Sequence, residues 1–340
     1  MGNGHGALVM FFTITAFDLI VVLILAFVID LVLGEPPFAI HPVVWIGNLI
    51  SFFKRKAPSK NRKTYGIFMA LCCILFAALI GTVATLILDT ESIPALIRYL
   101  VAAWFLKMTF AVRCLMDAGK EVYGKLATGD LDAARNDLSM YVSRNTSKLT
   151  PEQVSSAVIE TSSENFVDGI LSPLFYFALF GPLGIIAAYV FKAASTLDSM
   201  VGYRDPQYLH LGWFSARTDD ILNWIPARLS LIPIFIAAVL LRLVPSFSRS
   251  LDPASAVKIA IEDGTKTPSP NSGYPMAAFA GAMGIRLEKP NVYVLAARNP
   301  YPQFFHIKLA RSLVLSSSVI SVLMCASVLY IIMDRFYILY

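Results

Sequence analysis

Six long apolar runs dominate this 340-residue chain and restrict it to folds that a lipid bilayer can accommodate. A helix needs about 20 apolar residues to cross the hydrocarbon core, and such runs occupy residues 13–33, 66–88, 94–116, 169–191, 226–245 and 309–333. Hydrophobic residues make up 56% of the chain and charged residues only 15%, whereas soluble domains average roughly 25% charged. We therefore predict an all-α, polytopic integral membrane protein with about 4–6 apolar helices, some of them broken or re-entrant.

A basic segment between the first two runs indicates how the chain is oriented. It contains Lys54, Arg55, Lys56, Lys60, Arg62 and Lys63. Positive loops stay in the cytoplasm, and this pattern is weak evidence for nucleic-acid binding, so we expect no nucleic-acid partner. We predict one membrane-embedded domain over 1–340, with a cytoplasmic amphipathic helical segment at 117–167 and a polar loop segment at 246–308.

Simple counting of membrane spans meets a conflict in the second half. If 169–191 and 226–245 each cross once, the polar blocks 192–225 and 246–308 fall on opposite sides. Gly181-Pro182-Leu183-Gly184 interrupts the first of these runs, and Pro226 and Pro233 lie in the second. One of the two runs is therefore expected to be a broken or re-entrant helix pair lining a cavity.

Charged residues lie among these apolar runs between 160 and 228. Because an ionisable group at hydrocarbon depth is costly, such residues usually face a cavity, pair with each other or bind a ligand. Glu160, Glu164 and Asp168 are spaced four residues apart, so a regular helix would place all three on one face. That row suits Mg²⁺, although a solvated face neutralised by nearby Arg or Lys explains the spacing equally well.

The charges continue with alternating sign through Lys192, Asp198 and Arg204, and then through Arg217, Asp219, Asp220 and Arg228. Guanidinium groups recognise carboxylates and phosphates with two hydrogen bonds, and Lys serves as a point charge. For any single residue an internal ion pair is the simpler role. For the block as a whole we favour a binding site.

Two further blocks are rich in turn-forming residues. Pro268 to Pro275 includes Asn271, Ser272 and Gly273 and precedes a helix start, whose backbone N–H groups can hold an anion. An ordinary surface loop is the alternative. In the block from Asp30 to Pro42, a helix ends at consecutive prolines. Two acids and His41 then lie at the expected cytoplasmic end of that helix.

Taken in order, these blocks resemble the membrane adenosylcobinamide-phosphate synthase family of cobalamin biosynthesis. The resemblance covers about residues 20 to 310 and rests on Asp30–Pro37 with His41-Pro42, Ser143–Thr146, Glu160–Gly169 running into Ser172–Phe175, Thr196–Arg204, Ser215–Arg217 with Asp219-Asp220, Pro226–Arg228 and Ser269–Gly273. The chain departs from the family pattern at Asn145, Thr267 and Met276, so these three receive no catalytic role.

The resemblance implies an ATP-dependent ligase that joins adenosylcobyric acid to an amino-alcohol phosphate such as (R)-1-aminopropan-2-yl phosphate, giving adenosylcobinamide phosphate. ATP and Mg²⁺ are the implied cofactors. The expected catalytic residues are Glu160, Glu164, Asp168, Lys192 and Asp198. Those expected to bind substrate or phosphate are His41, Arg144, Asn165, Arg204, Arg217, Arg228, Asn271, Ser272 and Gly273. Metal binding is expected from Glu164, Asp168, Asp198, Asp219 and Asp220.

Two alternatives stay open from the sequence. Asp219-Asp220 with Asn223 resembles an Asp-rich Mg-pyrophosphate helix, which would indicate an intramembrane prenyl or phosphotransferase. Broken apolar runs beside charges also fit a secondary transporter. We expect a multi-pass protein of the cell membrane, with its active site on the cytoplasmic side. Its expected partners are the bilayer, a corrinoid and an amino-alcohol phosphate; homo-oligomers and contacts with later corrinoid-pathway membrane enzymes are left open.

Overall fold

A computed structural model describes residues 13–247 and 250–338, so the segment predictions that touch 1–12, 248–249 or 339–340 lie partly outside the described residues. The elements are α1 (Ala16–Leu33), η1 (Phe38–Ile40), α2 (Pro42–Arg55), α3 (Arg62–Asp89), α4 (Ala95–Lys107), α5 (Val112–Ala127), α6 (Leu131–Ser139), α7 (Pro151–Phe166), the π-helical turn η2 (Val167–Leu171), α8 (Ser172–Phe180), η3 (Gly181–Leu183), α9 (Gly184–Val201), α10 (Trp213–Leu222), α11 (Trp224–Leu229), α12 (Leu231–Arg242), α13 (Pro253–Asp263), α14 (Gly273–Met283), β1 (Leu287–Lys289), β2 (Tyr293–Leu295) and α15 (His306–Ile338).

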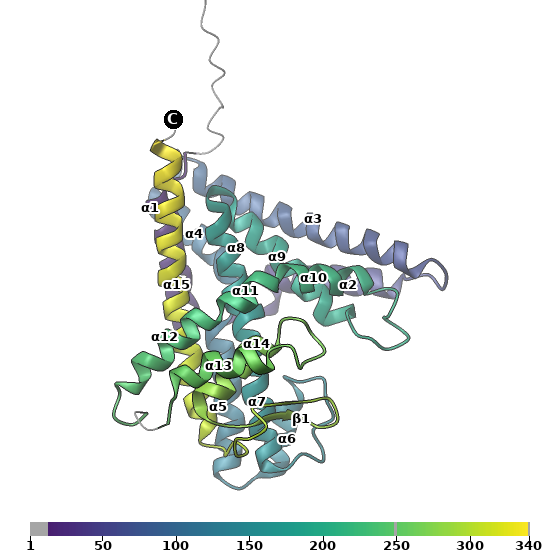
Figure 1. Cartoon of the computed structure of the whole chain (residues 1–340). Coiled ribbons are helices and arrows are strands. Elements are labelled where there is room, and N and C mark those ends of the chain that lie inside the picture. Colours follow the sequence, from purple (N-terminus) through teal and green to yellow (C-terminus); the bar gives the residue numbers. More distant parts are fainter. Residues whose placement is uncertain (1–12, 248–249, 339–340) are drawn as a thin grey trace, which may run out of the picture.

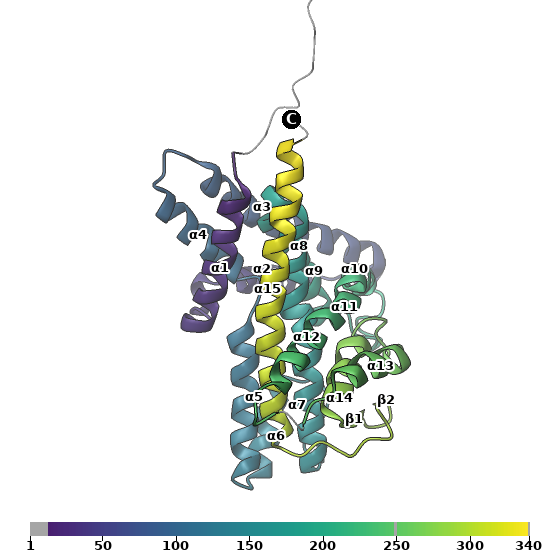
Figure 2. The same cartoon turned by 60° about the vertical axis from the view of Figure 1, so that its left-hand side comes forward.

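The predicted all-α, polytopic membrane architecture is confirmed. Five of the described helical segments are long and apolar enough to cross a membrane, or six if the bent pair α4 and α5 forms one span. In Figures 1 and 2, α1, α3, α4 and α8 occupy the upper part of the molecule, α5 to α7 and the β1–β2 hairpin the lower part, and α15 runs through both. Segment 246–308, expected as a loop, contains α13, α14 and the hairpin.

Close helix contacts in the apolar part depend on small residues, as is usual where helices pack within lipid. The helices α3 and α9 pack along each other. A Cβ atom added at Gly81 of α3 would lie 2.6 Å from the Cα atom of Ile186 in α9. Any larger residue at 81 would push the two helices apart and move the polar end of α9.

The run 169–191 is broken, as predicted. Helix α8 ends at Gly181, whose φ of 53° suits glycine. The chain then reverses, and α9 packs back against α8. A Cβ at Gly184 would lie 2.2 Å from the carbonyl oxygen of Phe177, so this tight reversal requires glycine. Two helices therefore take the place of a single crossing.

This reversal resolves the topological conflict. The Arg204 guanidinium donates a hydrogen bond to the carbonyl oxygen of Pro268 (3.2 Å), and the Asn271 amide donates to the carbonyl oxygen of Asp220 (2.7 Å). The polar blocks 192–225 and 246–308 thus lie side by side on the same face of the protein.

Candidate active site

The carboxylate row begins on α7 and continues through a π-helical turn. Pro173 has no N–H, so the carbonyl oxygen of Gly169 lacks its α-helical donor. That oxygen accepts a hydrogen bond from the backbone N–H of Ala111 instead, at 3.2 Å. Asp168 lies within the π turn, whereas the sequence predicted a regular helix to Gly169. Such turns are frequent at functional sites.

At the start of the row, Glu160 is buried, and both of its carboxylate oxygens accept hydrogen bonds. One oxygen accepts hydrogen bonds from Arg144 (2.7 Å) and from the Tyr293 hydroxyl (2.6 Å), and the other accepts one from Ser156 (2.7 Å). Tyr293 belongs to β2, which pairs antiparallel with β1. Glu160 and Arg144, predicted as catalytic and phosphate-binding, together fasten the hairpin to α7.

The next four charged residues of the site behave differently. Within residues 13–247 and 250–338, no hydrogen bond or ion pair engages the side-chain charges of Glu164, Asp168, Lys192 or Asp198. They are nevertheless neighbours, because Asp168 lies within electrostatic range of the other three. Lys192 and Asp198 come from α9, which the reversal at Gly181 brings back beside the π turn. The structure therefore brings these four predicted residues together.

Helix α10 adds a further carboxylate and is held in place by polar contacts. The Ser172 hydroxyl donates to Asn223 Oδ1 (2.6 Å), and Asn223 Nδ2 donates to Asp219 Oδ2 (3.0 Å). The other oxygen of Asp219, Oδ1, is buried without a partner. Burial, followed by the negative charges of Asp198, Asp220 and Glu164, raises the pKa of Asp219 to about 7.

Asp220 faces two of the predicted phosphate-binding arginines. Its carboxylate lies 3.9 Å from the exposed guanidinium of Arg217. Burial raises the pKa of Asp220, while the positive charges of Arg217 and Arg204 act in the opposite direction. The two arginines are thus close enough to the carboxylates to receive an anionic substrate there.

The turn-forming block before α14 closes this side of the site. Arg228 donates to the carbonyl oxygen of Trp224 (2.7 Å) and to Asn271 Oδ1 (3.3 Å), and its guanidinium stacks on the Trp224 and Tyr274 rings. A Cβ at Gly273 would lie 2.2 Å from a backbone oxygen, so glycine is needed for this close approach. Arg228 and Asn271 therefore connect α11 to this block.

Two other residues predicted to bind substrate are held by short-range contacts. Asn165 is exposed and donates to the carbonyl oxygen and the hydroxyl of Thr161 (2.9 and 3.2 Å). The backbone N–H of Ser272 donates to the hydroxyl of Ser269 (3.3 Å), so this N–H is already used within the loop.

At the end of α1, sequence reasoning identified Asp30, Glu35 and His41 but missed the lysine that pairs with the two acids. Lys107 is completely buried, with its ammonium 2.9 Å from Glu35 and 3.5 Å from Asp30. His41 Nε2 is also 2.9 Å from Glu35. Burial tends to raise the pKa of Glu35, but hydrogen bonds from His41 and Lys107 leave it below its ordinary value. A lone lysine inside the apolar run 94–116 was the available signal. Lys192 is within electrostatic range of Glu35, which joins this cluster to the carboxylates.

The carboxylates fit Mg²⁺ if the substrate supplies part of the coordination. No three Asp, Glu, His or Cys side chains in the described part of the chain converge closely enough to hold a metal ion alone. Mg²⁺ usually keeps several waters and takes only one or two protein carboxylates together with substrate phosphates. The buried, unpartnered Oδ1 of Asp219 is a suitable ligand of that kind.

Comparison with known proteins gives a consistent result. Residues 23–311 match the model of the family described as CobD/Cbib protein. The "Probable cobalamin biosynthesis protein CobD" of Methanothrix thermoacetophila is 42% identical over 320 residues, covering 92% of this chain and 97% of the relative. The "Cobalamin biosynthesis protein CobD" of Pelobacter propionicus is 41% identical over 274 residues, covering 80% and 81%. No solved structure matches the chain.

Proposed function

This chain belongs to the CobD/Cbib protein family, and on that premise we propose that it is a membrane ligase of cobalamin biosynthesis. The proposed reaction forms an amide bond between adenosylcobyric acid and an amino-alcohol phosphate such as (R)-1-aminopropan-2-yl phosphate, and converts ATP to ADP and phosphate.

One observation carries the proposal. Among the described residues, carboxylates with free oxygens and the unpaired ammonium of Lys192 converge from α7, the π turn, α9 and α10, beside Arg204 and Arg217. Both ATP and the amino-alcohol phosphate carry phosphates, and a reaction that brings several negative charges together needs cations fixed in advance. Mg²⁺ held by one or two of the carboxylates of Asp198, Asp219 and Asp220, together with substrate phosphates, would neutralise phosphate charge.

The reaction can be divided into two balanced steps. A propionate oxygen of the corrinoid attacks the γ-phosphorus of ATP, which gives an acyl phosphate and releases ADP. The amine then attacks the acyl carbon, the carbon–oxygen bond to phosphate breaks, and phosphate leaves. In this scheme Lys192 and Arg217 hold the phosphate oxygens, and positioning contributes most of the rate.

The attacking amine must also lose a proton, and the contacts favour a carboxylate as its acceptor. His41 Nε2 is paired with Glu35, and its Nδ1 accepts a hydrogen bond from the Val43 N–H (3.2 Å), so both ring nitrogens are occupied. Glu164 and Asp168 have free oxygens. We assign the proton to one of these two and give Glu160 a positioning role.

The site is proposed to face the cytoplasm. The guanidinium of Arg62, the basic residue that begins α3, donates to the carbonyl oxygen of Gln207 (2.9 Å) in the α9–α10 connection. Positive loops remain on the cytoplasmic side, so the adjoining site would lie there too. Cysteines introduced at positions 210 and 270 should both react from that side, and labelling from opposite sides would contradict this orientation.

An assay on purified protein in detergent tests the proposed activity. Protein would be given MgATP, adenosylcobyric acid and aminopropanol phosphate, and the corrinoid product followed by mass. We expect a product whose mass corresponds to an amide, with ADP formed in equal amount. Absence of that product, together with no substrate-dependent ATP turnover, would reject the ligase and return attention to the transferase and transporter alternatives.

A further inference from the structure

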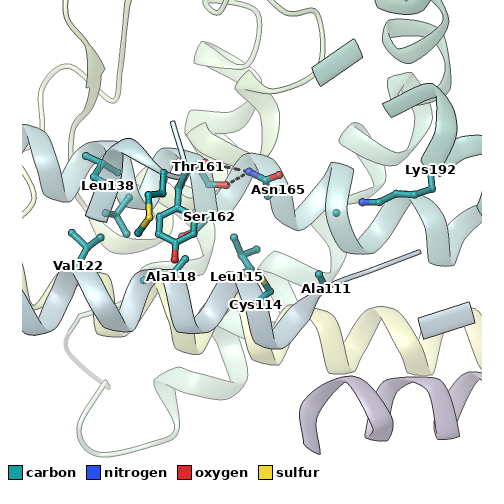
Figure 3. A pocket seen from close by; sticks show the side chains of 15 residues that line it. Ala111, Cys114, Leu115, Ala118, Val122, Leu138, Thr161, Ser162, Asn165 and Lys192 are labelled. Atoms are coloured by element: carbon teal, nitrogen blue, oxygen red, sulfur yellow. Dashed lines mark hydrogen bonds between the residues drawn. The ribbon is translucent and has the colours of Figure 1, made fainter. Parts of the chain in front are cut away.

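A slot of about 330 Å³ lies between α5 and α7 and reaches Lys192 of α9. Its α5 wall includes Leu115 and Ala118, and its α7 wall includes Ser162 and Asn165. Figure 3 shows the Lys192 side chain at one end, pointing back toward the slot. The slot therefore adjoins the carboxylates and shares Lys192 with their site.

One part of the slot wall is apolar and another is polar. Leu115, Ala118 and, at the far end, Leu138 supply an apolar surface, and small side chains on α5 keep the space open. Thr161, Ser162 and Asn165 of α7 present hydroxyl and amide groups at one edge. A flat, apolar ring system with a polar rim suits such a space, and the cation at the near end favours a phosphate or another anion beside it.

The charges on α5 bear on the kind of ligand that the slot could take. The outer face of α5 borders a second hollow lined by Arg113, Asp117, Lys120, Glu121 and Lys125. A helix face with five charges would be costly against hydrocarbon. A water-soluble ligand is therefore favoured over a lipid acyl chain.

We propose that this slot binds an adenosyl group, the base and sugar of an adenine nucleoside, with the rest of its carrier extending past Lys192 toward the carboxylates. This inference rests on the proposed function, which supplies two carriers: ATP and the adenosylated corrinoid. The volume accommodates an adenosyl group but is far too small for a corrin ring, which would remain outside.

Cys114 lines the slot and provides a reporter in the unaltered protein. It is exposed, whereas Cys73 and Cys325 are buried. Its alkylation by a maleimide would be followed by peptide mass, alone and with MgATP, adenosylcobyric acid or cyanocobyric acid, which lacks the adenosyl group. Protection by MgATP identifies the nucleotide as the carrier. Protection by adenosylcobyric but not by cyanocobyric acid identifies the corrinoid. Protection by neither adenosyl ligand overturns the proposal.

A pair of variants gives a second measurement. Ala118→Leu should fill the slot and raise the KM of the protecting ligand about tenfold or more. Ala127→Leu makes the same change at an exposed position on the same helix and should leave both KM values unchanged. Folded Ala118→Leu with wild-type KM values would overturn the proposal, and if this variant fails to fold, Cys114 protection decides alone.

The two proposals fail in different ways. If amide product forms while Cys114 is unprotected, the slot assignment is wrong and the ligase stands. If no product forms and ATP turnover does not depend on substrate, the ligase is wrong whatever happens at Cys114.

Discussion

Two groups of carboxylates lie close together and differ in how the protein uses their oxygens. Around Glu160, Arg144, Tyr293 and Ser156 all donate to the carboxylate, and the Ser156 hydroxyl in turn accepts the backbone N–H of Glu288 (2.9 Å). Around Asp219, a single amide donates to one oxygen and the other oxygen is buried without a partner.

The difference separates structural from ligand-binding charge. A buried carboxylate whose two oxygens both accept hydrogen bonds fixes the elements around it and has no free oxygen to offer a substrate. Neighbouring carboxylates without donors repel each other, and a fold that keeps them together indicates a function that uses them. We therefore propose that Glu160 serves the architecture and that the group from Glu164 to Asp220 serves the chemistry.

The largest expected effect is on stability, at the engaged carboxylate. Glu160→Gln leaves the largely buried guanidinium of Arg144 without its counter-charge, which should cost about 3–5 kcal/mol. Thermal unfolding in detergent would measure the loss, and Glu152→Gln, at a partly exposed position of the same helix, should behave as wild type. An unchanged melting temperature combined with lost turnover would show that Glu160 takes part in the reaction instead.

At the free carboxylates we expect a loss of turnover without a loss of stability. Glu164→Gln and Asp198→Asn should lower kcat about 100- to 1000-fold, as expected when a charge that stabilises the transition state is removed. Membrane insertion and melting temperature should change little, because neither side chain holds a structural partner. Asp132→Asn, at an exposed site, is the matched control. Wild-type turnover in both variants would return these carboxylates to a structural role.

A smaller effect concerns pH. Because the pKa of Asp219 is raised to about 7 in the folded protein, its ionisation opposes folding above that pH, and stability should increase as the pH falls from 8 through 7. Mg²⁺ would relieve this cost only where the carboxylate is ionised, so the gain in melting temperature on adding Mg²⁺ should be larger at pH 8 than at pH 6. Removing the metal with a chelator should reverse the gain, and an equal gain at both pH values would contradict this account.

The sequence predicted more of the membrane fold than of the site. Apolar length identifies most of the spans, and glycine and proline at 181–184 marked one of the two runs that could be broken, because these features act locally. The π turn at Asp168 could not be predicted from helical spacing, since it depends on the distant Ala111 N–H that takes up the Gly169 carbonyl. The engagement of Glu160 likewise depends on Tyr293, 133 positions away in the chain.

The sequence showed which residue types form the site, but not which of their side chains have hydrogen-bond partners. Glu160 and Glu164 are one helical turn apart and look equivalent in the sequence. Only the docked hairpin makes one of them structural and leaves the other free. The sequence did not predict a role for Lys107, because a single lysine does not prevent an apolar run from being interpreted as a membrane span.

Metal binding by the Asp219→Asn variant tests the central claim most directly. Mg²⁺ would be titrated calorimetrically, in the presence of aminopropanol phosphate and at pH 8, into the wild type, Asp219→Asn and Tyr293→Phe, whose lost hydroxyl removes a donor to Glu160. If the unpartnered carboxylates are the ones that serve the substrate, Asp219→Asn should bind Mg²⁺ at least about tenfold more weakly while Tyr293→Phe binds as wild type. Equal affinity in Asp219→Asn and the wild type would contradict the account.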